Sequence, residues 1–238
     1  MIKAEHLKMV YGGTFTSVDD LSFHIGKGEI VGFVGPNGAG KTTVIKMLTG
    51  ILKPTEGKAV INGYDIVKDD LKAKSSLAYV ADNPDLLLQL KGIEYINFIA
   101  DIYGISSEER AERIGELAKR FGMEDALDKS MREYSHGMRQ KLMIIAALVH
   151  NPPVWILDEP MTGLDPQAAF ELKEMMREHA AKGNCVLFST HVLEVAEKLC
   201  DRILIINHGH ELYQGTLENL ESRHPGEDLE KIFLEIIK

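Results

Sequence analysis

Residues 35–43 have the composition and spacing of a phosphate-binding loop. They read GPNGAGKTT and match the pattern G-x-x-x-x-G-K-[ST] directly after a short apolar segment. Glycines let successive backbone N–H groups turn toward an anion, the lysine reaches the outer phosphates, and the next hydroxyl suits Mg²⁺. The segment therefore predicts a site for a nucleoside triphosphate rather than a glycine-rich turn without a ligand. The residues expected to bind it are Asn37, Gly38, Ala39, Gly40, Lys41, Thr42 and Thr43, with Thr42 also a magnesium ligand.

Two adjacent carboxylates, Asp158 and Glu159, follow the apolar segment 154–157. Ligands of open α/β sheets bind at the carboxyl ends of the strands, so a strand ending here would bring both acids to the binding edge. Neighbouring residues of a strand point to opposite sides, which predicts different roles for the two. We expect Asp158 to bind Mg²⁺ and Glu159 to accept a proton from, or orient, an attacking water. A strand that merely ends in solvated acids is the alternative, and the phosphate loop makes it the weaker one.

Short apolar segments and helical periodicity indicate the elements that position these groups. Strands buried on both faces of a parallel sheet are nearly continuous apolar runs. Residues 166–182 have a helical pattern, with Asp165 as a candidate N-cap, Pro166 at the first position and Gly183 just past the end. Strands alternating with such helices predict an α/β sheet with helices on its faces. The apolar segments are 30–34, 154–157, 185–188 and 203–206.

The remaining segments predict two additions to this sheet. Residues near the N-terminus and in 58–66 alternate between apolar and polar, as in half-exposed antiparallel strands. Residues 84–151 lack strand signals and show helical spacing, with a capping box formed by Ser106 and Glu109. The expected fold class is therefore α/β: a P-loop NTPase core of the RecA-like type with a mainly parallel sheet, an N-terminal antiparallel β subdomain and an inserted α-helical subdomain. The expected division of a single domain, 1–238, is an α/β core in 1–83 and 151–215, a helical subdomain in 84–150 and a C-terminal helical tail in 216–238.

Composition excludes several classes of protein. Hydrophobic residues make up 45% of the chain and charged residues 26%, values of a folded globular protein. With 27 Lys and Arg against 36 Asp and Glu, the net charge of −9 disfavours binding to nucleic acid. The longest apolar run, 142–149, is too short to cross a bilayer, and the polar start has no signal-peptide core. Cys185 and Cys200 fit no disulfide framework or zinc site, so we expect a reducing, cytoplasmic location.

Five segments in order give the chain a strong resemblance to the ATP-binding subunit of ABC transporters, over essentially its whole length. The phosphate loop corresponds to that family's Walker A motif. An ordered set of this kind, with a helical insertion before the Walker B motif, is peculiar to the family. The other four are YSHGMRQ at 134–140 (signature), LDEP at 157–160 (Walker B), TGLD at 162–165 (D-loop) and STH at 189–191 (switch histidine).

The resemblance implies how two copies of the chain would share one nucleotide. Ser135 and Gly137 directly precede a helical run, so the serine hydroxyl and free N–H groups would form a second anion-binding cap. In the family, this signature of one copy closes over the nucleotide held by the phosphate loop of another. An ATP-dependent head-to-tail dimer with two nucleotides is therefore implied. Were Ser135 only a helix cap, its mutation would weaken folding slightly and leave turnover unchanged.

The resemblance also assigns roles to two residues outside the phosphate loop. His191 stands where the family has a histidine that contacts the γ-phosphate and the attacking water. Tyr11 matches the aromatic residue that stacks on adenine, although a tyrosine packed in a strand is the simpler alternative. Asp165 could bridge the dimer or only cap the following helix, and both roles remain open.

Two departures from the family pattern bear on function. Asp82 stands where a glutamine is usual, and as a shorter, charged residue it could still bind Mg²⁺ directly or through water. In the signature, Tyr134, His136 and Met138 replace the commonest leucine, glycine and glutamine, while the serine and second glycine remain. Variants of this form resemble the exporter branches of the family, including exporters of drugs and antimicrobial peptides, which favours export over import.

The function implied is that of an ATPase, converting ATP and water to ADP and phosphate with Lys41, Glu159 and His191 as catalytic residues. Its expected partners are membrane-spanning permease subunits and a second ATP-binding subunit, identical or not. Such a chain would be cytoplasmic, held on the inner face of the cell membrane by those partners.

The main alternative is an ABC-type clamp acting on nucleic acid or the ribosome, which the acidic charge and the lack of a second cassette disfavour. A small-molecule phosphotransferase is a further rival, but it would leave Ser135, Gly137 and His191 without a role.

Overall fold

The computed structural model describes residues 1–82, 88–224 and 226–237, and its centre is a six-stranded sheet. The strand order is β10-β9-β3-β8-β7-β6; all neighbours are parallel except β10, which pairs antiparallel with β9. The mainly parallel α/β sheet expected from the sequence is confirmed. Its strands are β3 (Ile30–Val34), β6 (Leu77–Val80), β7 (Val154–Leu157), β8 (Cys185–Thr190), β9 (Arg202–Asn207) and β10 (His210–Gly215).

A second, antiparallel sheet is formed by strands in the order β2-β1-β4-β5. Apolar residues alternate along β1 and β2, so one face of each strand packs into the core and the other faces solvent. This confirms the antiparallel part expected near the N-terminus. The strands are β1 (Ile2–Tyr11), β2 (Phe15–Ile25), β4 (Glu56–Ile61) and β5 (Tyr64–Asp65).

Helices cover both faces of the six-stranded sheet, as the alternating side chains of β3 show. Val31 and Phe33 pack in one apolar core with α1 and the antiparallel sheet, whereas Ile30 packs with α5 and α6 and Val34 with α7, α8 and α9. Strands buried on both faces must be apolar throughout, which accounts for the short apolar runs in the sequence. The helices on these faces are α1 (Lys41–Leu48), α6 (Pro166–Ala181), α7 (Leu193–Leu199), α8 (Leu217–Ser222) and α9 (Leu229–Ile236).

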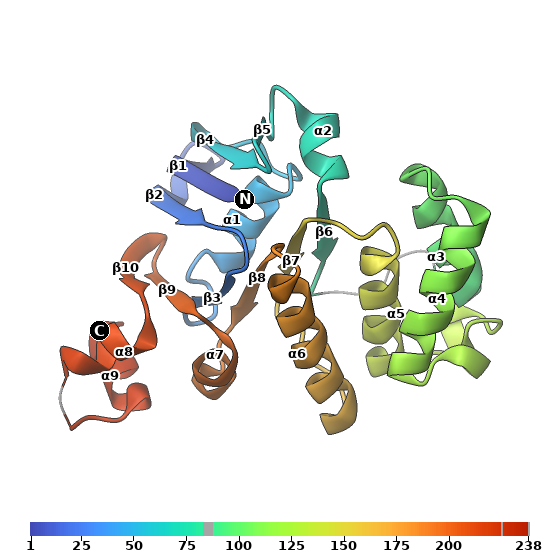
Figure 1. Cartoon of the computed structure of the whole chain (residues 1–238). Helices are drawn as coiled ribbons and strands as arrows, with labels where there is room; N and C mark the ends of the chain where they lie inside the picture. The colour runs from blue at the N-terminus through green and yellow to red at the C-terminus, as the bar shows by residue number, and fades with distance from the viewer. Residues whose placement is uncertain (83–87, 225, 238) are drawn as a thin grey trace.

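The other helices lie mainly beyond the edge strand β6, where α3, α4 and α5 form a group to one side of the molecule (Figure 1). Ser106 caps α4 by accepting the Glu109 N–H at 3.3 Å, as its capping box predicts. Arg120 of α4 makes ion pairs with Glu171 and Glu178 of α6. These pairs join the group to one of the helices that cover the sheet. The helices are α2 (Asp70–Ser75), α3 (Gly92–Ile102), α4 (Ser107–Phe121) and α5 (His136–Leu148), with short 3-10 turns at Glu124–Ala126 and Met131–Glu133.

Residue 84, the expected start of the helical subdomain, lies outside the described residues. Within the described parts of the chain, no helix has both the length and the apolar composition needed to span a membrane.

Candidate functional site

The phosphate loop connects β3 to α1 with two glycines in the left-handed region. Gly38 has φ 83° and Gly40, the N-cap of α1, has φ 106°. A Cβ atom on Gly40 would lie 2.8 Å from the backbone oxygen of Ser17, so this position admits no side chain. The tight curve brings the loop against β2 and aims the first N–H groups of α1 at the space above it, as anion binding requires.

Lys41 is buried under this loop and is only 6% exposed. Its Nζ donates hydrogen bonds to the carbonyl oxygens of Gly35 at 2.6 Å and Pro36 at 3.2 Å. The same ammonium lies 3.6 Å from the Glu159 carboxylate. The loop thus holds a positive charge in place between its own backbone and the acidic end of β7.

A cavity of about 370 Å³ opens over the loop. Tyr11 and Phe15 face each other across the β1–β2 hairpin, and both line this cavity. The Tyr11 and Ser17 hydroxyls lie 3.4 and 3.0 Å from that of Thr43. The residues lining it are Tyr11, Phe15, Ser17, Pro36, Asn37, Gly38, Ala39, Gly40, Lys41, Thr42, Thr43, Asp82 and Glu159.

Sequence reasoning found most of this lining but missed Phe15 and Ser17. Both belong to β2, whose alternating pattern predicts only a strand, and no motif marks either residue. Their proximity follows from the pairing of Tyr11 with Phe15 and from the contact of β2 with the loop. The hairpin Gly12-Gly13 was the available signal, because a tight turn after Tyr11 returns the chain toward the same place.

The acidic residues follow β7, and one serine hydroxyl joins them. The Ser189 hydroxyl donates a hydrogen bond to Oδ1 of Asp158 at 2.5 Å and accepts one from the Glu159 N–H at 2.9 Å. Asp158 is 1% exposed, and its Oδ2 has no partner among the described residues. Burial, together with the negative charges of Asp158 and Asp82, raises the pKa of the nearby Tyr79 hydroxyl. Ser189 is a site residue that the sequence named only as part of the STH segment.

Glu159 has a conformation that few residues other than glycine adopt. Its φ is +47°, in the left-handed region, and its side chain is 16% exposed. One carboxylate oxygen lies 2.9 Å from Nδ1 of His191, and the other lies near Lys41. Backbone strain of this kind costs on the order of 1–3 kcal/mol and is concentrated at functional sites. The structure therefore brings Lys41, Glu159 and His191 together, as the sequence predicts.

The oxygen atoms near the loop suit a magnesium ion. Mg²⁺ binds carboxylate and hydroxyl oxygens and is usually held by one or two carboxylates together with phosphate oxygens. Asp82 and Thr42 line the cavity over the loop, whereas Asp158, which is not among the described lining residues, offers a buried oxygen without a partner within the described chain. The three residues expected to be magnesium ligands thus fit that ion.

The signature residues are placed apart from this cavity. Ser135 caps α5, its hydroxyl accepting the Met138 N–H at 3.2 Å, and neither Ser135 nor Gly137 is among the described residues lining the cavity over the loop. A Cβ on Gly137 would lie 2.6 Å from the Gly163 oxygen, so the start of α5 packs closely against the 162–165 segment. In that segment, Asp165 caps α6 through the Ala168 N–H and pairs with Lys141 at 2.8 Å. The Lys141 ammonium, followed by the Ala168 N–H, lowers the pKa of Asp165.

The phosphate loop lies at the carboxyl edge of a parallel sheet and contains a buried lysine. Two acids follow β7, which is separated from β3 by one strand of the sheet. These features define a P-loop nucleoside triphosphatase. The family model described as ABC transporter matches residues 18–162. The chain belongs to this family and is an ATP-binding subunit of an ABC transporter, with ATPase activity coupled to transport.

Relatives and solved structures agree with this assignment. The chain is 36% identical to the ABC transporter ATP-binding protein NatA of Bacillus subtilis (strain 168) over 219 residues, covering 92% of this chain and 89% of that protein. It is 35% identical to the linearmycin resistance ATP-binding protein LnrL of the same organism, covering 96% of this chain and 73% of LnrL.

Among solved structures, an ATP-binding subunit of an ABC transporter superposes with a TM-score of 0.95 at 34% identity, and the match covers 100% of both chains. A dimeric structure of the bacterial ABC transporter cassette MJ0796 superposes with a TM-score of 0.82 at 26% identity, covering 91% of this chain and 99% of that one. These likenesses confirm the expected P-loop α/β fold.

Proposed function

We propose that this chain hydrolyses ATP as one half of a head-to-tail dimer, under membrane-spanning partner subunits that export a solute. The observation that carries the dimer is the separation of two anion-binding ends within one chain. The phosphate loop and Lys41 line one cavity, while Ser135 and Gly137 start α5 elsewhere. If a second copy placed the start of its α5 over the first copy's cavity, the nucleotide would contact the anion-binding groups of both copies. The dimeric structure of MJ0796 is consistent with such a pairing.

Within each nucleotide site, we assign binding to the loop and to the hairpin beside it. The N–H groups of residues 37–43 and the Lys41 ammonium hold the phosphates, and Tyr11 stacks on the adenine ring. Ser135 and Gly137 of the second copy bind the γ-phosphate from the opposite side. Thr42, Asp158 and Asp82 would hold a magnesium ion, which would neutralise charge on the phosphates.

The residues that act on water are Glu159 and His191. The Glu159 carboxylate, between Lys41 and His191, accepts a proton from the attacking water or orients it. His191 contacts the γ-phosphate side of the site and orients the Glu159 carboxylate, which lies 2.9 Å from its Nδ1. Lys41 and the loop N–H groups stabilise the charge that develops on the transferred phosphoryl group.

The organisation of the chain follows the same proposal. The α/β core in 1–83 and 151–215 holds ATP, the helical subdomain in 84–150 carries the signature and the surface for the membrane partner, and 216–238 form a tail. Those partners keep the chain at the inner face of the membrane. Export is supported by the Tyr-Ser-x-Gly-Met form of the signature and by the similarity to a linearmycin resistance protein.

Alanine substitutions at two helix-capping serines test the proposal. Ser135 and Ser106 both cap a helix in the same way, so each Ser→Ala change removes about 1 kcal/mol of helix stability. We expect Ser135→Ala to lower ATP turnover at least about tenfold, because a phosphate contact is lost as well. Ser106→Ala should leave turnover unchanged. Equal turnover in the two variants would mean that Ser135 is a helix cap only, and would contradict the shared nucleotide site.

A further inference from the structure

Tyr134, the residue directly before the signature serine, is buried although its neighbour faces solvent. It is 3% exposed and packs among the apolar residues of the helical group, whereas Ser135 is exposed at the start of α5. The peptide bond holds consecutive Cα atoms about 3.8 Å apart, so a displacement of one residue moves the other. The position of the exposed serine therefore depends on the contacts that hold the buried tyrosine.

A hydrogen bond holds the Tyr134 hydroxyl inside the core. The hydroxyl donates to the backbone oxygen of Ala126 at 2.6 Å. Burial, followed by the negative charges of Asp128 and Glu133, raises the pKa of Tyr134, so its hydroxyl stays protonated and remains a donor at neutral pH. The leucine that is commonest at this position of the signature has no hydroxyl. This chain therefore has a contact behind the signature that the common form of the motif cannot make.

The first residue of α3 is a glycine, and the tyrosine hydroxyl accounts for it. A Cβ atom on Gly92 would collide with Oη of Tyr134, whereas the next nearest atoms would be 3.3 Å away. Gly92 has a helical backbone, and alanine is the better helix former, so the backbone conformation does not require glycine. The Gly92 and Ile93 N–H groups donate to the backbone oxygens of Lys129 and Leu127 at 3.2 and 2.9 Å. The start of α3 is thus joined to the segment that leads into the signature.

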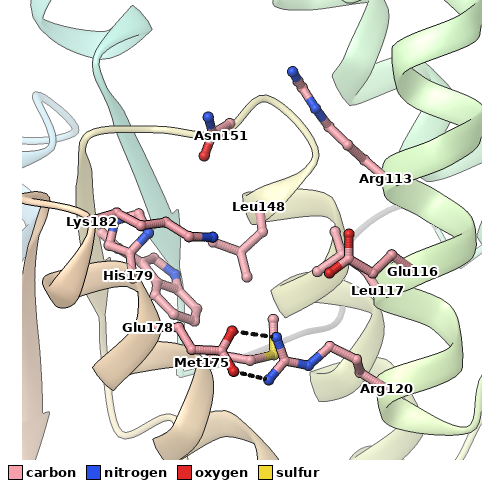
Figure 2. Close-up of a pocket in the computed structure, with 11 residues that line it drawn as sticks. Arg113, Glu116, Leu117, Arg120, Leu148, Asn151, Met175, Glu178, His179 and Lys182 are labelled. Carbon is pink, nitrogen blue, oxygen red and sulfur yellow. Dashed lines mark hydrogen bonds and ion pairs between the residues drawn. The ribbon is translucent and has the colours of Figure 1, made fainter.

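The turn that accepts the tyrosine hydrogen bond follows a helix that is fixed on α6. Ala126 ends the short 3-10 turn that comes after α4. In the last turn of α4, Arg120 donates two hydrogen bonds of 2.7 and 2.9 Å to Glu178 of α6, drawn in Figure 2. A series of contacts therefore runs from α6 through the end of α4 to Ala126, and from there through the Tyr134 hydroxyl to Ser135.

We propose that Tyr134 is a positioning residue, whose hydroxyl sets the place at which Ser135 meets the phosphates held by a second copy of the chain. The inference rests on the proposed function, because Ser135 must contact that nucleotide. Tyr134 is buried and acts through Ser135, not on the nucleotide itself. Misplacement of a contacting group by about 1 Å can lower a reaction rate on the order of 100-fold, so a small shift of the serine is enough to be measured.

Tyr134→Phe removes only the hydroxyl, and Tyr213→Phe is its matched control. Tyr213 is 7% exposed and packs against α8 and α9, and its hydroxyl donates to the backbone oxygen of Thr216, also at 2.6 Å. The two variants should lose similar stability in urea, because each loses one hydrogen bond of the same kind. Only Tyr134→Phe should lower the kcat of ATP hydrolysis, by at least about fivefold.

Binding of Mg-ADP to the single chain, measured by calorimetry, separates a positioning role from a general loss of structure. We expect the parent affinity in Tyr134→Phe, because the phosphate loop of the same chain is unchanged. An equal kcat in Tyr134→Phe and Tyr213→Phe would overturn the proposal. A kcat that falls together with the affinity for ADP would also overturn it, because the damage would then extend to the phosphate loop.

Gly92→Ala tests the same contact from the side of α3. Its Cβ should push the Tyr134 hydroxyl away and lower kcat. The double variant Gly92→Ala/Tyr134→Phe should be no slower than Tyr134→Phe alone, because the atom that collides with the new Cβ is gone. Losses that multiply in the double variant would contradict a contact shared through the hydroxyl.

Ser135→Ala distinguishes failure of this inference from failure of the proposed function. If Ser135→Ala lowers turnover and Tyr134→Phe does not, the positioning role of Tyr134 is wrong and the shared nucleotide site stands. If neither variant lowers turnover, the shared site is wrong as well.

Discussion

The Ser189 hydroxyl fixes the two acids of the site relative to each other, since it contacts Asp158 on one side and the Glu159 N–H on the other. Ser189→Ala removes both hydrogen bonds inside a buried region. We expect a loss of about 1–3 kcal/mol in the free energy of unfolding, because a buried donor and acceptor lose their partners. Ser189 also positions Asp158. In Ser189→Ala we therefore expect a rise in the Mg²⁺ concentration that is needed for half-maximal ATPase activity.

Urea unfolding and ATPase assays at varied Mg²⁺ concentration check this expectation. Ser75→Ala is the control, because among the described residues the exposed Ser75 hydroxyl of α2 bonds the backbone oxygen of Leu71 and no other group. If Ser189→Ala loses stability but keeps the Mg²⁺ dependence of the parent chain, Ser189 has a structural role only.

At the scale of single residues, the sequence predicts what a local motif determines. The phosphate loop could be assigned completely because its residues are consecutive, and His191 could be assigned through the resemblance. The left-handed backbone of Glu159 could not, because a φ of +47° at a glutamate results from the tertiary structure around it. The two contacts of Ser189 join residues 30 and 31 positions apart and follow from the adjacency of β7 and β8.

The start of α1 depends on a glycine for two reasons, its backbone angle and the close approach of β2. Gly40→Ala places a Cβ 2.8 Å from the Ser17 oxygen at φ 106°. We expect a loss of more than about 1 kcal/mol in stability and a marked loss of ATP binding, since the loop must shift. Gly115→Ala, in the middle of α4 with no atom within 4 Å of the new Cβ, should instead stabilise by about 0.5–1 kcal/mol. Thermal unfolding and ATP titration of both variants measure the difference.

The helix α6 carries a buried histidine that makes stability depend on pH. Burial lowers the pKa of His179 to about 4, from an ordinary value of 6.5. Between these values the unfolded chain binds more protons than the folded one, so stability falls as pH decreases from about 6.5 to 4. By pH 5 the loss from this group amounts to about 2 kcal/mol.

Urea midpoints of the parent chain and of His179→Gln at pH 7 and pH 5 test this effect. The variant should lose less stability between the two pH values, whereas His210→Gln, at an exposed position on β10, should behave like the parent. A parent and a His179→Gln variant with equal losses would contradict a buried, neutral histidine in the folded state.

At the scale of elements, apolar runs and capping residues were sufficient to predict the buried strands and the start of α6 at Pro166. The ion pairs of Arg120 with α6 were beyond such reasoning, because they join residues 51 and 58 positions apart on two separate helices. Neither partner belongs to a motif, and charged residues on a helix usually indicate only a solvated face.

At the scale of the whole molecule, the sheet order places β3 between β8 and β9, so the phosphate loop and His191 meet at one edge although they are far apart in sequence. Alternation of strands and helices predicts the class of this sheet, but the order of strands needs the family resemblance or the structure. The same arrangement puts the start of α5 outside the described lining of the cavity in its own chain, which is why we propose that a second copy completes the nucleotide site.

Sedimentation of the Glu159→Gln variant tests this shared site most directly. Loss of the carboxylate should stop hydrolysis while ATP and its contacts remain, so bound ATP should hold two chains together. We expect a dimer with ATP and Mg²⁺, a single chain without nucleotide, and a single chain again when Ser135→Arg blocks the start of α5. A Glu159→Gln chain that binds ATP yet sediments as a single chain at every protein concentration would contradict the dimer.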